Sequence, residues 1–153
     1  MHEDIAIGIK TVSFSEITHE WILVTAAGIT LFSLFQAWLA SFIVYGEVKS
    51  LKKIFPATHN LIRSHIDYLM MASLLGVVYF SCLLLSIALP PVIIAILCFG
   101  AIYNPLGFMF KAVSPRLGHD GSLQTKIGVL VGFLPATIGF GYSMAAILLK
   151  LVS

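Results

Sequence analysis

Residues 61–89, LIRSHIDYLMMASLLGVVYFSCLLLSIAL, decide how this chain folds. No charged residue follows Asp67 in this stretch, and an uncharged apolar run of that length is typical of a helix that crosses a membrane. The first turns nevertheless carry three ionisable side chains, those of Arg63, His65 and Asp67. Ionisable groups at membrane depth are costly and often functional, so these residues are the first candidates for a site.

The composition of the whole chain indicates a membrane environment. The sequence has 153 residues, of which 59% are apolar and only 10% are charged, and its mean hydropathy is +1.00. Soluble domains carry about 25% charged residues, so water is not the main solvent here. The net charge of +2 does not favour nucleic acid as a partner. Cys82 and Cys98 fall in apolar segments and are predicted to be small buried side chains.

Four apolar segments of spanning length predict an all-α fold, an integral membrane four-helix bundle. Pro90 and Pro91 separate the second segment from the third, because a helix cannot continue through two prolines. Gly128, Gly132 and Ala136 recur every four residues in the last segment and predict a ridge of small residues for close helix packing. We expect a single transmembrane domain, residues 1–153, with spans at residues 21–45, 61–89, 91–110 and 127–151.

Basic residues gather in two connecting segments. Residues 46–60 hold three lysines, and residues 111–126 hold Lys111, Arg116 and Lys126. Positively charged loops tend to stay in the cytoplasm. The sequence therefore predicts that both basic loops are cytoplasmic and that both termini are outside.

Helix geometry sorts the polar residues of the second span. Arg63 and Asp67 are four residues apart and share a face, so they can pair. His65 lies about 200° round the helix from Arg63, on the same face as Tyr68. Its imidazole is a good ligand for iron or zinc. Two plainer interpretations remain open: His65 faces lipid headgroups, or Arg63 and Asp67 form a salt bridge that fixes the depth of the helix.

The third span places Asn104 in mid-helix, between Tyr103 and Pro105. An unpaired amide in a membrane interior is costly. Pro105 removes a backbone donor and so frees a carbonyl near Ala101. Asn104 either satisfies that carbonyl or orients a substrate atom in a buried pocket. The sequence contains no metalloprotease, paired-cysteine or phosphate-loop motif, so hydrolase and nucleotide chemistry are not supported.

Several short motifs resemble styrene oxide isomerase and the related hydroxylaminobenzene mutases. The strongest are RSH at residues 63–65, NPLGFMF at residues 104–110 and SPRLG at residues 114–118. A looser likeness extends to HEWIL at residues 19–23 and FLPA at residues 133–136. The resemblance therefore covers most of the chain.

This resemblance implies a small four-span enzyme of the bacterial cytoplasmic membrane that assembles as a trimer and binds haem b. By the likeness, His65 is the axial ligand. Arg63 lies near the predicted cytoplasmic interface and is a candidate partner for a haem propionate, in place of Asp67. Ferric iron would act as a Lewis acid on a small apolar substrate, either turning an epoxide into an aldehyde or rearranging an arylhydroxylamine. Asn104 would help to place the substrate.

The chain departs from the family pattern around the substrate. The family tyrosine that follows the asparagine by four residues falls on Phe108, and a second family asparagine falls on Met71. A Ser-Gly pair after the histidine is replaced by residues 66–67, Ile-Asp. Tyr103 is the candidate replacement for the missing tyrosine, on a different helical face. The axial position is kept, whereas much of the pocket is changed.

Three other functions are compatible with the sequence. A small oligomeric transporter or channel could use Gln36, Asp67 and Asn104 as a polar path. A b-type haem electron carrier would need two axial histidines, and only His65 is well placed within a span. The third is a structural subunit of a larger membrane complex.

Overall fold

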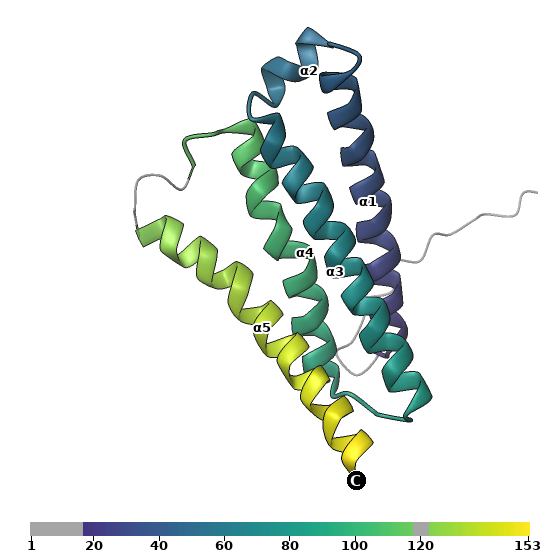
Figure 1. Ribbon diagram of the computed structural model, residues 1–153. Coiled ribbons are helices and arrows are strands. Elements are labelled where there is room, and N and C mark those ends of the chain that lie inside the picture. The colour runs from purple at the N-terminus through teal and green to yellow at the C-terminus, as the bar shows by residue number, and fades with distance from the viewer. Residues whose placement is uncertain (1–16, 118–122) are drawn as a thin grey trace, which may run out of the picture.

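The computed structural model describes residues 17–117 and 123–153 (Figure 1). This part of the chain is helical and contains no strand, and four of its five helices are long and apolar enough to cross a membrane. The predicted all-α fold is thereby confirmed, and four long apolar helices form the predicted bundle. In chain order the helices are α1 (Glu20–Val44), α2 (Lys49–Ile54), α3 (Thr58–Leu84), α4 (Pro91–Val113) and α5 (Leu123–Val152).

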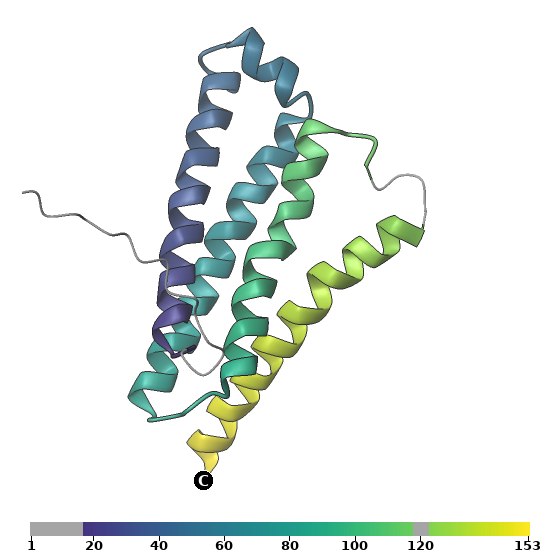
Figure 2. The same cartoon turned by 180° about the vertical axis from the view of Figure 1, so that it is seen from behind.

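Helices α1, α3 and α4 pack around a common core, and α5 packs along α4 (Figure 1, Figure 2). Helix α5 lies against α4 near the end where α3 connects to α4, and it diverges from α4 toward the end that carries α2 (Figure 1). The main core cluster joins α1, α3 and α4. It consists of Ile22, Ala26, Ile29, Tyr68, Met71, Leu75, Val78, Cys82, Leu89, Ile94, Leu97 and Ala101. A smaller cluster at the α2 end consists of Ala40, Ile43, Phe55, Leu61 and Ala112.

Large apolar side chains cover the outside of the bundle. Leu31 is 69% exposed, Trp38 is 65% exposed and Leu84 is 84% exposed. Contiguous apolar surface of this kind is a liability in water, but lipid chains solvate it in a bilayer. The surface therefore agrees with an integral membrane protein.

The second span ends earlier than residue 89. Helix α3 stops at Leu84, because Ser86 adopts a positive φ of 52° and the Ile87 N–H bonds back to the Cys82 carbonyl at 2.9 Å. The chain then passes to Pro91, the first residue of α4, where the missing proline N–H costs the helix nothing. Helices α4 and α5 also run past the predicted limits, to Val113 and from Leu123 respectively.

Residues 46–60 were predicted to be a basic loop, and for residues 49–54 this is wrong because they form the short helix α2. The lysines of α2 are exposed, whereas Phe55 directly after it is buried with Leu61 and Ala112. Burial of the Phe55 ring anchors the connection to the bundle. This tertiary contact stabilises a helix too short to form on its own.

Two glycines allow α4 and α5 to approach closely. A Cβ atom at Gly100 would lie 2.4 Å from the Ala136 backbone nitrogen, and one at Gly139 would lie 2.6 Å from Leu97 Cα. Carbon and nitrogen atoms do not approach that closely, so both positions have to lack a side chain. The sequence pattern did not single out either glycine.

The predicted ridge of small residues has two different environments. Ala136 lies at the α4–α5 contact and is buried. A Cβ at Gly132 would make only ordinary contact with Tyr103, at 3.6 Å, and a Cβ at Gly128 would meet no atom within 4 Å. The ridge thus leads from a tight contact into open space.

We expect Gly139→Ala to destabilise the protein by about 1–3 kcal/mol, because the added methyl group forces α5 away from Leu97. Gly141→Ala is the matched control, since it adds the same methyl group to the same helix with no heavy atom within 4 Å. The midpoint of thermal unfolding in detergent should fall for Gly139→Ala and should not fall for Gly141→Ala. Equal midpoints for the two variants would contradict this account of the α4–α5 contact.

Candidate functional site

The ring of His65 is held against α1 by Ser33. His65 is half-buried near the start of α3, and its Nδ1 lies 2.9 Å from the Ser33 carbonyl oxygen and 2.7 Å from Ser33 Oγ. Ser33 Oγ donates in turn to the His65 carbonyl at 2.9 Å. Because a carbonyl oxygen can only accept, Nδ1 carries the ring hydrogen. Nε2 therefore keeps its lone pair and can bind a metal.

This arrangement matches what a metal-binding histidine needs. Such a histidine usually donates its other ring N–H to a carbonyl or carboxylate, which sets the ring orientation and raises the basicity of the ligating nitrogen. No three His, Cys, Asp or Glu side chains come together within residues 17–117 and 123–153. His65 is therefore the one candidate here for a metal group that needs a single histidine, as a haem does.

A layer of buried polar groups continues from His65 across the bundle. Gln36 Nε2 donates to Ser64 Oγ at 3.0 Å, and Ser64 Oγ donates to the Pro105 carbonyl at 3.2 Å. Ser33, Gln36 and Ser64 are wholly buried, and Gln36 Oε1 has no hydrogen-bond partner among the described residues. We call these three residues with His65 the polar layer. It joins α1 to α3 and α3 to α4 at one depth.

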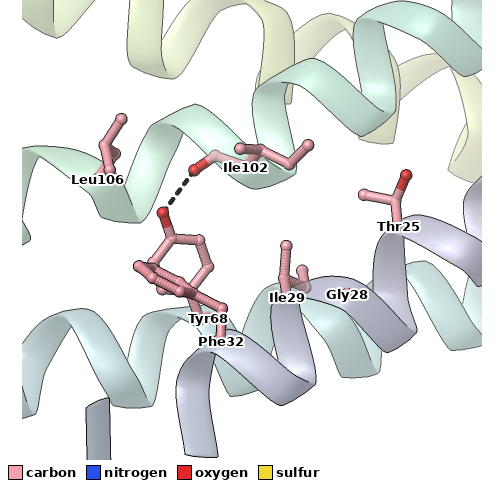
Figure 3. A pocket seen from close by; sticks show the side chains of 7 residues that line it. All are labelled: Thr25, Gly28, Ile29, Phe32, Tyr68, Ile102 and Leu106. Carbon is pink, nitrogen blue, oxygen red and sulfur yellow. Dashed lines mark hydrogen bonds between the residues drawn. The ribbon is translucent and has the colours of Figure 1, made fainter. Parts of the chain in front are cut away.

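The polar layer is followed by an apolar pocket between α1 and α4 (Figure 3). Tyr68 closes this pocket: its hydroxyl donates to the Ile102 carbonyl at 2.9 Å, and its ring meets Phe32 edge to face at 5.3 Å. The volume is about 350 Å³, and the lining residues are Thr25, Gly28, Ile29, Phe32, Tyr68, Ile102 and Leu106. None of the sequence-predicted site residues lines it.

Asn104 and Tyr103 line a second hollow, the α4–α5 cleft. It lies where α5 diverges from α4 and has a volume of about 400 Å³. The Tyr103 ring also stacks on Phe99, with centroids 5.4 Å apart. Asn104 thus lines the cleft together with Gly132. This cavity is a place where Asn104 could contact a ligand, as the second interpretation of this residue requires. The lining residues are Tyr103, Asn104, Gly107, Phe108, Phe110, Lys111, Leu117, Gly128, Val129, Gly132 and Phe133.

Among the described residues Arg63 does not line this cleft, but it contacts Phe108, which does. Its guanidinium carbon lies 5.7 Å from the centre of the Phe108 ring, and Lys111 Nζ lies 6.0 Å from the same centre. These are cation–π distances. No ion pair joins Arg63 to Asp67 in the described part of the chain, so the predicted salt bridge is not formed.

The sequence-predicted site residues therefore occupy two places. His65 lies on the α1 side of α3, whereas Arg63, Tyr103 and Asn104 lie toward the α4–α5 cleft. His65 is absent from the cleft lining within the described residues. Sequence reasoning missed Ser33 and Ser64, and the available signal was the polar pair three residues apart, Ser33 and Gln36, in an otherwise apolar span.

Comparison of the chain with protein-family models, curated proteins and solved structures found no match.

Ser64→Ala should lower stability by about 1 kcal/mol, because it leaves the Gln36 amide nitrogen without its partner in the bundle interior and removes the bond from Ser64 to the Pro105 carbonyl. Gln36→Leu is the comparison, since it removes a buried amide whose oxygen already has no partner. Thermal unfolding in detergent should show a smaller loss for Gln36→Leu, or none. A larger loss for Gln36→Leu than for Ser64→Ala would refute the role given to this chain of bonds.

Proposed function

We propose that the protein is a haem b-dependent isomerase that acts within the membrane, with His65 as the axial ligand. The observation that carries the proposal is the hydrogen bond from His65 Nδ1 to the Ser33 carbonyl, which directs the lone pair to Nε2. The RSH motif at residues 63–65 and the NPLGFMF motif at residues 104–110, which resemble styrene oxide isomerase, support it.

His65 would hold the haem, and the bound ferric haem would supply a Lewis acid for the oxygen of a small apolar substrate. His65 provides the single nitrogen ligand, and Ser33 prevents its ring from rotating. The bilayer concentrates apolar substrates around the protein. The overall reaction is an intramolecular rearrangement, from epoxide to aldehyde or within an arylhydroxylamine, with no net redox change.

This function requires more than one copy of the chain. Within one protomer His65 and Asn104 do not reach a common substrate, because they lie on different sides of α3 and α4. In a cyclic oligomer, the α1–α3 face of one protomer meets the α4–α5 face of the next. We therefore propose a trimer in which Asn104 and Tyr103 of one protomer face the haem of its neighbour.

The membrane that fits this function is a bacterial cytoplasmic membrane. The exposed lysines of α2 and the basic residues after α4 lie at the same end of the bundle (Figure 1). The positive-inside rule places that end in the cytoplasm, with both termini outside.

A transporter or channel is the second candidate, and the unpartnered Gln36 Oε1 within the polar layer favours it. Transport requires a path from one membrane face to the other. The polar layer instead crosses the bundle at one depth, and its three non-histidine members are wholly buried. Uptake into proteoliposomes by a colourless protein would support the transporter.

Cyanide binding to a bound haem would argue against the third candidate, a bis-histidine electron carrier.

His65→Ala should bind haemin at least about tenfold more weakly than the wild type, because it removes the only proposed axial ligand. The measurement is a haemin titration of the purified protein in detergent, read from the Soret band. His59→Ala is the matched control, an exposed histidine near the start of the same helix. A wild type without a Soret band, or an unchanged band in His65→Ala, would overturn the proposal.

Asn104→Ala should lower kcat/KM for a small aryl epoxide by about tenfold to a hundredfold and leave the Soret band unchanged, since it removes a hydrogen bond to substrate but no haem ligand. Co-expressing His65→Ala and Asn104→Ala chains tests the trimer. Where the two kinds of chain meet, the Asn104→Ala chain supplies an intact His65 and the His65→Ala chain supplies an intact Asn104. Part of the activity should therefore return. No activity in the mixture would exclude a site shared between protomers.

A further inference from the structure

Two cations share one aromatic ring at the wide end of the α4–α5 cleft. Arg63 reaches the Phe108 ring from α3, and Lys111 reaches it from α4, one turn beyond Phe108. Both Phe108 and Lys111 line the cleft. Like charges repel, so placing two of them on one ring makes this end of the cleft favourable for an anion.

Most of the remaining lining of the cleft is apolar. Val129 and Phe133 of α5 and Gly107 of α4 belong to it, and the glycines at 128 and 132 leave the space between the helices open. Asn104 lies seven residues before Lys111, which is about 10 Å along α4. The cleft thus has a cationic end, an amide part of the way along and apolar walls throughout.

We propose that the α4–α5 cleft binds an amphipathic anion, a molecule with an apolar body and one carboxylate or phosphate head. The head lies at Lys111, where Arg63 adds positive charge from its place over the Phe108 ring, and the body lies along the glycines of α5 past Asn104. Asp67 is one turn from Arg63 and offsets part of the positive charge, so a single negative charge on the head is the best complement. A basic pocket between membrane helices at the cytoplasmic end is a common anion site.

The proposal also accounts for a departure from the resembling family. The position of the family tyrosine is Phe108 here, and its ring is covered by the two cations instead of offering a hydroxyl to a neutral substrate. Only the identification of this anion as the isomerase substrate rests on the proposed function. Binding itself can be measured on protein without haem, so a failed haem titration leaves the test intact.

The first test needs no variant. The purified full chain in detergent is titrated with dodecanoate and with dodecanol, which share a tail and differ in charge, and binding is followed by native mass spectrometry or calorimetry. Two basic groups near the head should give dodecanoate an advantage of about tenfold or more. Equal affinities for the acid and the alcohol would overturn the proposal.

Variants then locate the site. Lys111→Gln and Arg63→Gln should each weaken dodecanoate binding about fivefold, and Lys111→Arg should keep most of it. Lys150→Gln, at the other end of α5, is the charge control. Gly128→Leu should weaken binding of the acid and the alcohol alike by filling the cleft, whereas Gly141→Leu should change neither. An equal loss in Lys150→Gln and Lys111→Gln would refute the assignment.

A second pair of probes separates the possible sources of the anion. Phosphatidylglycerol and phosphatidylcholine of equal chain length are compared in the same way. If Lys111→Gln weakens the binding of dodecanoate alone, the ligand is a small carboxylate. If it weakens the binding of phosphatidylglycerol alone, the ligand is a membrane lipid. Either supports the site. Binding of both anions that ignores Lys111 and Arg63 contradicts it.

Discussion

The contact between His65 and Ser33 sets α3 against α1 where bulk water does not compete for hydrogen bonds. In a bilayer there is little hydrophobic gain from bringing two apolar helices together, so polar contacts and close packing decide the pairing. Three hydrogen-bond contacts join Ser33 and His65 here, and Gln36 adds a fourth link one turn away through Ser64. The rotation of α3 about its axis follows from these links. That rotation directs the imidazole toward α1 and the guanidinium of Arg63 toward Phe108 of α4.

Hydropathy alone was sufficient for the fold, because a charge-free run after Asp67 has no stable place in water. The ends of the helices could not be predicted as well from the sequence. The end of α3 at Leu84 depends on the conformation of Ser86, and helix α2 depends on burial of Phe55. The site was predictable as residue types but not as an arrangement. His65 meets a partner 32 positions earlier in the chain, and its tautomer follows from that partner. Asn104 was expected to help place a substrate near His65, whereas packing of the helices puts it in the α4–α5 cleft, whose described lining does not include His65.

Small residues have two separate uses on α5. Near Gly139 they bring the helix into backbone contact with α4, and near Gly128 they leave the space that becomes the cleft. A repeat of small residues in the sequence indicates that something approaches closely, but it does not say whether a helix or a ligand does so. Here one repeat serves both purposes, and the change from one to the other occurs within three turns of helix.

The backbones of α4 and α5 meet closely at Gly100 and Gly139, and α5 diverges from α4 toward the end that carries α2 (Figure 1). Near this contact Phe140, Met144 and Ala146 of α5 also pack against the core that α1, α3 and α4 share. One end of α5 is therefore built into the bundle, and the angle at which the other end leaves α4 sets the width of the cleft.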